Sequence, residues 1–287
     1  MIAYLLWRLW RKAIREFFVE RWMLLFSLSG DSEDMSEFTV LRPPDDRFWA
    51  DPHVFRRNDD HYVFFEDASV SSGRGHIAVM RLGNDGAFSS PKTVIERDYH
   101  LSYPFVFEWR HQIYMIPESA ENQTIELYRC KEFPFDWEYS HDLMENVLAY
   151  DTTLIEHDGI WWLFANMQQH AGASSWDELC LFYSDSPIST KWFPHPMNPV
   201  VSDVRYARPA GKVFSKNEKL FRPSQNSSHR YGYGLNICEI IEMSTTSYKE
   251  KVIRKVLPDW HHSLRCVHTF SQTDDLVMID AICRTRR

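Results

Sequence analysis

The hydrophobic pattern of this chain repeats about every fifty residues. Each copy has an apolar run of strand length, a short polar turn, and a second apolar run that often ends on a carboxylate or an amide. The copies begin at Asp51, Tyr103, Asp151, Arg208 and Val267. Apolar runs joined by turns such as NDD, HDG and TDD predict five β-hairpins.

A third alternating run follows each of the first four hairpins. These runs begin at His76, Thr124, Glu178 and Leu235. Fourth, outer strands are expected at residues 92–96, 137–141, 199–201 and 251–257. Four strands per repeat are typical of a propeller blade, so the pattern predicts an all-β fold, a five-bladed β-propeller. A β-sandwich with irregular spacing is the alternative.

The fifth hairpin ends close to the C-terminus and lacks outer strands of its own. Strand-like stretches near the N-terminus, VERWMLLFSL from Val19 and FTVLRPP from Phe38, can supply them. Closing the ring with these strands removes the exposed sheet edges that an open propeller leaves. We therefore predict one propeller domain over residues 18–287, closed by N-terminal strands.

Residues 1–17 carry apolar side chains at helical spacing, interrupted by arginine and lysine. The pattern predicts a short amphipathic helix that packs on the domain, or else lies at a membrane interface. The charges exclude a membrane span, and the pattern of a signal peptide is absent. We expect a cytoplasmic protein, with peripheral contact at the inner face of the membrane as the alternative.

Composition and motifs limit the classes of ligand and partner that the chain is expected to bind. The net charge of -8 argues against nucleic acid as a partner, which requires a clustered basic surface. The five cysteines are scattered and read as reduced, buried residues. The sequence has neither a metal-ligand spacing nor a phosphate-cradling glycine loop, so we expect no metal and no cofactor.

In a propeller the first strand of each blade lines the central channel, so polar residues where these strands begin point to a common axis. These positions give Asp51, Tyr103 with Ser102, Asp151, Arg208, and His268 or His262. The ends of the second strands add Glu66, Asp67, Glu118, Asn166, Gln225 and Asp280. The sequence predicts a site at the channel mouth.

Three carboxylates are the predicted catalytic residues: Asp51, Asp151 and Glu118. Two carboxyl groups across a cavity can divide the roles of acid and base. Burial would suit Glu118 to the part of the acid, but a salt bridge to Arg208 is an equal alternative. Asp51 and Asp151 can instead cap turns, as aspartates commonly do.

The predicted substrate-binding residues are His53, Glu66, Tyr103, Arg208, Arg222, Gln225, Tyr231 and His268. The two arginines offer a bidentate fork for phosphate or carboxylate, although Arg222 also reads as a surface residue before a turn proline. The run from Arg222 to Asn236 mixes amides, hydroxyls and aromatic faces, which suits a sugar. Four tryptophans, Trp49, Trp109, Trp161 and Trp162, are sugar platforms or, more in keeping with their strands, core residues.

Several motifs together carry a family resemblance: FWADPHVF, HLSYPFVFEW with MIPES, DTTLIEHDGIWWLF, ARPAGKVF, and FRPSQ with YGYGLNI. Over about residues 38–283 the chain resembles the N-terminal propeller domain of plant glucosamine inositolphosphorylceramide transferases and its bacterial stand-alone or formyltransferase-linked relatives. More distantly, it is similar to the five-bladed arabinanase, xylosidase and invertase superfamily.

The distant resemblance implies that Asp51 acts as base or nucleophile and that Asp151 tunes the pKa of the acid. The blade-four glutamate of those glycosidases is replaced by Arg208-Pro209. We therefore expect a carbohydrate-active enzyme, with glycosyl transfer in bacterial surface polysaccharide or glycolipid assembly as the first reading. Its substrate would be a sugar or sugar nucleotide, with a lipid-linked acceptor. The alternatives are a glycoside hydrolase acting on furanosides and a non-catalytic glycan-binding propeller.

Overall fold

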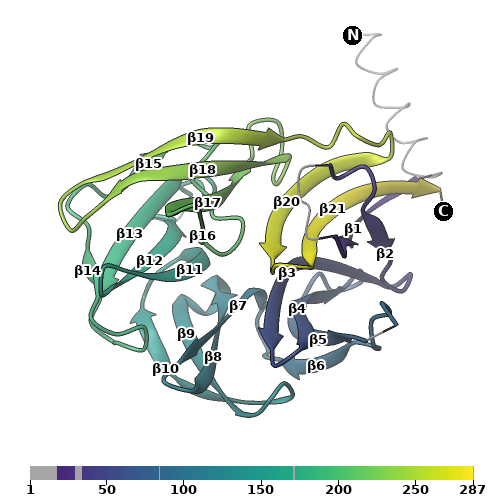
Figure 1. Cartoon of the computed structure of the whole chain (residues 1–287), viewed down its shortest axis with the longest axis horizontal. Coiled ribbons are helices and arrows are strands. Elements are labelled where there is room, and N and C mark those ends of the chain that lie inside the picture. The colour runs from purple at the N-terminus through teal and green to yellow at the C-terminus, as the bar shows by residue number, and fades with distance from the viewer. Residues whose placement is uncertain (1–17, 30–33, 84, 171, 287) are drawn as a thin grey trace.

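Each sequence repeat forms one antiparallel sheet, and the five sheets stand around a common axis (Figure 1). The computed structural model describes residues 18–29, 34–83, 85–170 and 172–286. Its sheets confirm the predicted five-bladed β-propeller. The predicted N-terminal helix, residues 1–17, lies outside the described residues. Within the described part of the chain, no helix has the length and apolar character needed to cross a membrane.

The first three blades follow the chain in order. Blade one contains β3 (Arg47–Arg57), β4 (Asp60–Ser69), β5 (Gly75–Leu82) and β6 (Lys92–Ile95). Blade two contains β7 (Ser102–Trp109), β8 (Gln112–Ser119), β9 (Thr124–Glu132) and β10 (Asp136–Glu145), with a short 3-10 turn, η1 (Ala120–Asn122). Blade three contains β11 (Ala149–His157), β12 (Ile160–Met167), β13 (Glu178–Ser184), β14 (Phe193–Pro194) and β15 (Val201–Ser202). Its outer edge is split between β14 and β15, where one strand was expected.

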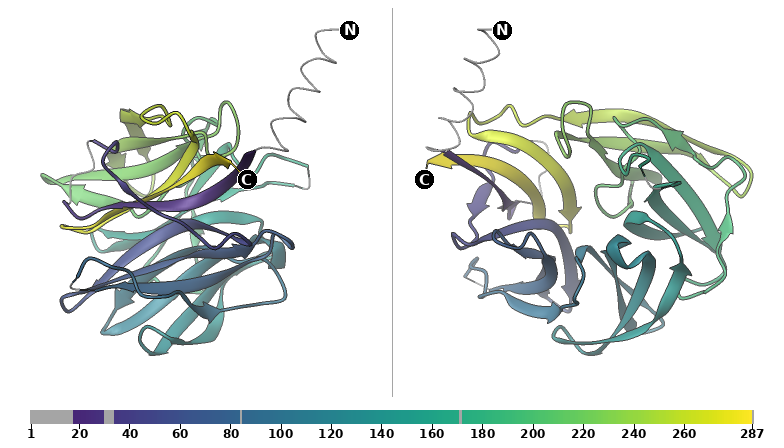
Figure 2. Two further views of the ribbon diagram at one scale, coloured as in Figure 1. Left: turned by 90° about the vertical axis from the view of Figure 1, so that its right-hand side faces the viewer. Right: turned by 180° about the vertical axis from the view of Figure 1, so that it is seen from behind.

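The last two blades complete the ring. Blade four contains β16 (Phe214–Lys216), β17 (Lys219–Asn226), β18 (Gly234–Met243) and β19 (Tyr248–Val256). Blade five contains β20 (Leu264–Gln272), β21 (Val277–Arg286), β1 (Phe18–Ser27) and β2 (Thr39–Leu41). Strand β1 pairs with β21 from Phe18↔Arg286 to Ser27↔Val277, so the two ends of the chain share one blade (Figure 2). The predicted closure by N-terminal strands is confirmed.

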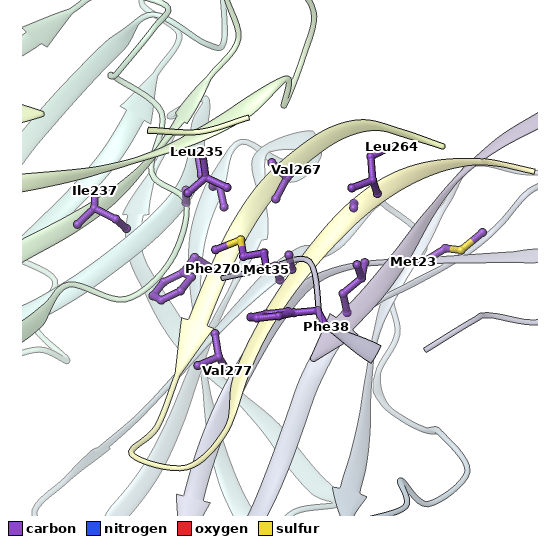
Figure 3. Packing of buried hydrophobic residues seen from close by; sticks show 14 of the residues in the cluster. Met23, Met35, Phe38, Leu235, Ile237, Leu264, Val267, Phe270 and Val277 are labelled. Carbon is purple, nitrogen blue, oxygen red and sulfur yellow. The ribbon is translucent and has the colours of Figure 1, made fainter. Parts of the chain in front are cut away.

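The hydrophobic core is divided among the interfaces between neighbouring blades. One cluster joins blades four and five through Leu235, Val267 and Phe270, with Met23 contributed by the closing strand (Figure 3). Trp162 and Trp49 are buried in other clusters, and Trp109 and Trp161 pack against the cluster between blades two and three. All four tryptophans are therefore packing residues, as their strand positions favoured. The five cysteines are buried and free.

The innermost strands share a kink near their beginning. In β3, β7, β11 and β20 the register with the second strand shifts at a β-bulge. There, two residues of the inner strand stand opposite one residue of the second strand. Asp51, Tyr103 and Asp151 sit in these bulges with left-handed φ angles of 53°, 42° and 54°. Such angles are costly for residues other than glycine, and bulges redirect side chains. The fold therefore places three strained polar residues at the same level of the ring.

Candidate active site

An arginine from blade four joins carboxylates from blades two and three. The guanidinium of Arg208 forms a bidentate pair with Asp151, at 2.6 Å from Nε to Oδ2 and 3.1 Å from Nη2 to Oδ1. Its Nη2 also donates to Glu118 Oε2 at 3.2 Å. Gln225 Nε2 donates to Asp151 Oδ2 at 2.8 Å. Four blade positions predicted from the repeats thus meet in one hydrogen-bonded group.

Asp51 of blade one occupies the neighbouring part of the site and is held by groups from blades two and five. Its Oδ1 accepts from Thr269 Oγ1 at 2.8 Å, and its Oδ2 accepts from the Tyr103 backbone N–H at 3.3 Å. Its own N–H donates to Asp280 Oδ2 at 2.8 Å. Burial, opposed by the His268 charge and aided by the charges of nearby aspartates, raises the pKa of Asp51 to about 6. This carboxyl group therefore titrates close to neutral pH.

Asp280 is a fully buried anchor for this arrangement. Besides the Asp51 N–H, it accepts the backbone N–H groups of His268 and Thr269 and the Nδ1 of His268, at 2.7–3.2 Å. His268 is stacked on Trp22 of the closing strand, with ring centroids 4.0 Å apart, and its Nε2 lies 3.7 Å from Asp51 Oδ1. Although burial opposes the imidazolium, Asp280 and the other carboxylates raise the pKa of His268.

Glu118 is largely buried, with its side chain 10% exposed. Burial raises its pKa well above the usual value. Arg208 opposes this rise, whereas the Asp151 and Asp51 charges and a hydrogen bond with Asp151 support it. The contact with Arg208, one of the two alternatives for Glu118, is therefore present, and the pKa of this group is raised despite it.

Glu66 holds the equivalent place in blade one. Burial and the charges of Asp51, Glu118 and Asp280 raise its pKa well above the usual value. Its Oε1 lies 3.4 Å from His100 Nε2. A Cβ at Gly75 would lie 2.6 Å from the same Oε1, so the glycine is needed for Glu66 to occupy this place.

The remaining predicted residues divide between the site and its supports. The Tyr103 hydroxyl bonds to Thr153 Oγ1 of blade three at 2.9 Å, and the Tyr231 ring lies over the Arg208 guanidinium and edge-on to His268. His53 donates from Nε2 to the Val106 carbonyl at 2.9 Å. Burial and Lys212 lower the pKa of His53 to about 3, so this histidine is a neutral tie between blades one and two.

Arg222 does not join the cluster. It is 1% exposed and forms a bidentate pair with Glu250 of β19, at 2.8 and 2.6 Å. It also donates to the carbonyl oxygens of Ala207 and Tyr206. The substrate-binding role predicted for Arg222 is wrong for this site, because the protein itself takes up its hydrogen-bonding fork, and so is the alternative of a surface arginine.

Three contributors were not among the predicted site residues: Thr269, Trp22 and Trp176. Thr269 lies beside His268 in the bulge of β20, so the bulge position itself was the available signal. Trp22 comes from a strand recognised only as a ring-closing element. Trp176 lies in the loop between the second and third strands of blade three, and no sequence pattern marks it.

Potential metal ligands of Asp51, His268 and Asp280 lie within 4.8 Å of one another. Both Asp280 oxygens, however, already face N–H donors from Asp51, His268 and Thr269. His268 also directs Nδ1 to Asp280, which leaves only its Nε2 and the Asp51 carboxylate for an ion. Two such ligands are fewer than protein metal centres ordinarily use, so the set fits an anchored carboxylate better than a metal site.

Fold and site together define a five-bladed propeller with carboxylates where the inner strands begin, a fold found in glycoside hydrolases. The catalytic domain of the Coprinopsis cinerea family 62 α-L-arabinofuranosidase matches with a TM-score of 0.60 and 11% identity, covering 93% of this chain and 97% of that one. Zg3597, a family 117 glycoside hydrolase of Zobellia galactanivorans, matches with a TM-score of 0.59 and 10% identity, covering 92% and 90%. Such low identities establish the fold alone.

Sequence comparison identifies the family. Residues 41–268 match the family described as glucosamine inositolphosphorylceramide transferase 1, N-terminal, and the chain belongs to it. Glucosamine inositolphosphorylceramide transferase 1 of rice, Oryza sativa subsp. japonica, is 35% identical over 206 residues, which are 71% of this chain and 27% of the relative. The match thus spans about a quarter of that relative's length.

Proposed function

We propose that the chain acts on glycosidic bonds, transferring a glycosyl group to an acceptor hydroxyl at the Asp51–Glu118 site. The observation that carries this proposal is a buried cluster of carboxyl groups from adjacent blades, in which Arg208 joins Glu118 to Asp151 and the Tyr103 N–H of blade two donates to Asp51. Burial raises the pKa of Asp51 to about 6 and the pKa of Glu118 well above its ordinary value. Carboxyl groups in different protonation states can serve as base and acid in one reaction.

In the proposed reaction, Glu118 gives its proton to the leaving-group oxygen as the bond to the anomeric carbon breaks. Asp51 accepts the proton of the acceptor hydroxyl as its oxygen bonds to that carbon. Arg208 and Asp151 hold Glu118 in place. With water as acceptor the same groups would hydrolyse the bond, so a glycoside hydrolase is the second candidate, favoured by the fold of the structural neighbours.

The pairing of Arg208 and Arg222 bears on which glycosyl donor the site could bind. Arg208 is neutralised by Asp151 and Glu118, and Arg222 by Glu250. Neither guanidinium is left as an open phosphate fork, so this pair gives no support to a sugar nucleotide over another activated glycoside. Similarity to the plant glucosamine inositolphosphorylceramide transferases supports a lipid acceptor. We place the reaction in bacterial surface polysaccharide or glycolipid assembly, at the cytoplasmic face with peripheral membrane contact.

The test is a screen of sugar nucleotides and aryl glycosides, each with and without lipid-linked acceptors, on wild type, Asp51→Asn and Glu118→Gln. We expect each substitution to lower the rate about 100-fold or more. Aryl glycosides with good leaving groups should restore Glu118→Gln, because they need no acid, but should not restore Asp51→Asn.

The control is Glu239→Gln, a carboxylate paired with Lys219 and Lys251 on blade four, which should keep the wild-type rate. Formation of a new glycoside in the presence of acceptor identifies transfer, and release of free sugar identifies hydrolysis. Equal rates for wild type and Asp51→Asn would remove Asp51 from the mechanism.

A further inference from the structure

The loop between β12 and β13 reaches the centre of the site. In every blade, the end of the second strand lies at the same end of the ring as the start of the first strand, so this loop emerges beside the bulges. The Ser175 carbonyl accepts a hydrogen bond from Arg208 Nη1 at 3.0 Å. The residue after Ser175 is therefore held next to the Arg208–Asp151–Glu118 group.

That residue, Trp176, exposes its large apolar side chain. It is 36% exposed, and its backbone N–H is bound by Ser174 Oγ at 3.1 Å. An aromatic side chain that is tied in place beside polar groups, and still open to solvent, gains little from the protein core. Exposed aromatic surface beside a polar site is typical of ligand recognition.

Trp176 begins a row of rings across this end of the propeller. Its ring centroid lies 5.7 Å from that of Tyr231, which lies 5.3 Å from His268, which in turn stacks on Trp22 at 4.0 Å. Gly232, with a φ of 62°, permits the close approach of the Tyr231 loop, since a Cβ there would lie 2.8 Å from the His268 Cβ. The row runs from blade three to blade five past the carboxylates.

We propose that Trp176, with Tyr231 beside it, forms a stacking subsite for a second sugar ring next to the ring that reacts. The ligand would then be an oligosaccharide, or the glycan of a glycoconjugate, with at least two pyranose rings. Gluco-configured rings suit it because their substituents are equatorial and their faces are apolar, so a ring can lie flat on an indole. This inference rests on the proposed function in taking the carboxylate cluster as the reacting site.

The test measures binding rather than turnover, in the Asp51→Asn background, by isothermal titration and tryptophan fluorescence. The probes are cellotetraose and the β-1,4-linked glucosamine tetrasaccharide, with glucose and glucosamine as single-ring controls. We expect at least one tetrasaccharide to bind more tightly than its monosaccharide. Trp176→Ala should weaken that binding about tenfold, and Trp176→Phe should keep most of it. Monosaccharide affinity should not change.

The matched control is Phe193→Ala. Phe193 is 56% exposed and stacks on Tyr183, but at the outer edge of blade three, so its removal should leave every affinity unchanged. The proposal is overturned if Trp176→Ala binds the tetrasaccharides as its parent does, or if neither tetrasaccharide binds more tightly than its monosaccharide. If the Trp176 result holds while Asp51→Asn proves as active as wild type, the subsite stands and the proposed catalytic role falls.

Discussion

Arg208 and Arg222 make an informative pair. Each precedes a proline, each is buried, and each forms a bidentate pair with a carboxylate. Among the described residues, Arg222 has one carboxylate partner, Glu250, which is also bound by the Tyr248 hydroxyl at 2.6 Å. Arg208 contacts a second carboxylate, Glu118, in addition to Asp151, and lies against the ring of Tyr231, which in turn neighbours Trp176.

The difference lies in the place that each arginine takes within its blade. Arg208 lies where blade four enters the ring of inner-strand starts, alongside Asp51, Tyr103 and Asp151. Arg222 lies three residues before Gln225, where the other blades place the buried apolar residues Val63, Met115 and Leu163. The two buried arginines therefore occupy different surfaces of the same blade, and residue type alone does not distinguish these positions.

The largest effect should come from breaking the ion pair between Arg222 and Glu250. Arg222→Met leaves Glu250 buried without its partner, which costs about 3–5 kcal/mol of unfolding free energy. Urea denaturation at neutral pH measures it. Replacing both partners, with Arg222→Met and Glu250→Leu, should recover most of the loss. A loss below about 1 kcal/mol in the single variant would contradict a structural role for this pair.

Ionisation of Asp51 should instead lower the free energy of unfolding as the pH rises. The folded-state pKa of Asp51, about 6, exceeds its ordinary value, so its protonated form stabilises the fold at low pH. That contribution is lost as the pH rises from about 4 through about 6, and its full size is about 3 kcal/mol. Denaturation of wild type and Asp51→Asn at about pH 4.5 and pH 7.5 should show wild type losing more stability. Parallel changes would mean an ordinary Asp51 pKa.

Removing the charge of Asp280 should have a smaller effect, on the pKa of His268. Because the carboxylate faces Nδ1, Asp280→Asn should lower the pKa of His268 by about one unit, or about 1.4 kcal/mol. Nitrogen-detected NMR titration of the imidazole measures it. His141, which bonds to the Ile188 carbonyl on the outside of the ring, is the internal control. An unchanged His268 pKa would show that Asp280 only anchors the backbone.

The smallest effect should come from a neutral contact of the site. Tyr103→Phe removes the hydroxyl that bonds to Thr153 across blades two and three, at a cost of about 1 kcal/mol. Thermal denaturation should show a small drop in Tm, with the pH dependence of stability left as in wild type. A change in that pH dependence would place the hydroxyl among the groups that set the carboxylate pKa values.

Most of the fold could be predicted from the sequence repeat. Hairpins of matching pattern fixed the blade starts, and a fifth hairpin without partners required the N-terminal strands to close the ring. The split outer edge of blade three was not foreseen, because β14 and β15 are short and a pattern of two residues carries no periodicity. The packing of Trp162 and Trp49 followed from their positions within strands.

The site was foreseen where it lies on the repeat and missed where it does not. Asp51 and Asp151 stand where first strands begin and Glu118 stands where a second strand ends, so two positions of the repeat indicated all three. Arg222 was misassigned because its residue type was weighed without its register against the other blades. Trp176 lies in a loop, outside the strands that define the repeat, and Trp22 contacts His268 because β1 closes the ring. The spacing of the repeats predicts neither the contact of Trp176 with Tyr231 nor that of Trp22 with His268.

The central claim is that Asp51 and Glu118 stand in different protonation states near neutral pH. Carbon-13 NMR titration of labelled aspartate and glutamate carboxyl groups, assigned with Asp51→Asn and Glu118→Gln, measures both directly. The account predicts a midpoint near pH 6 for Asp51 and a higher midpoint for Glu118, so that the proton stays on Glu118 when Asp51 ionises. Both groups ionising together at the ordinary pKa of exposed carboxylates, about 4, would contradict it.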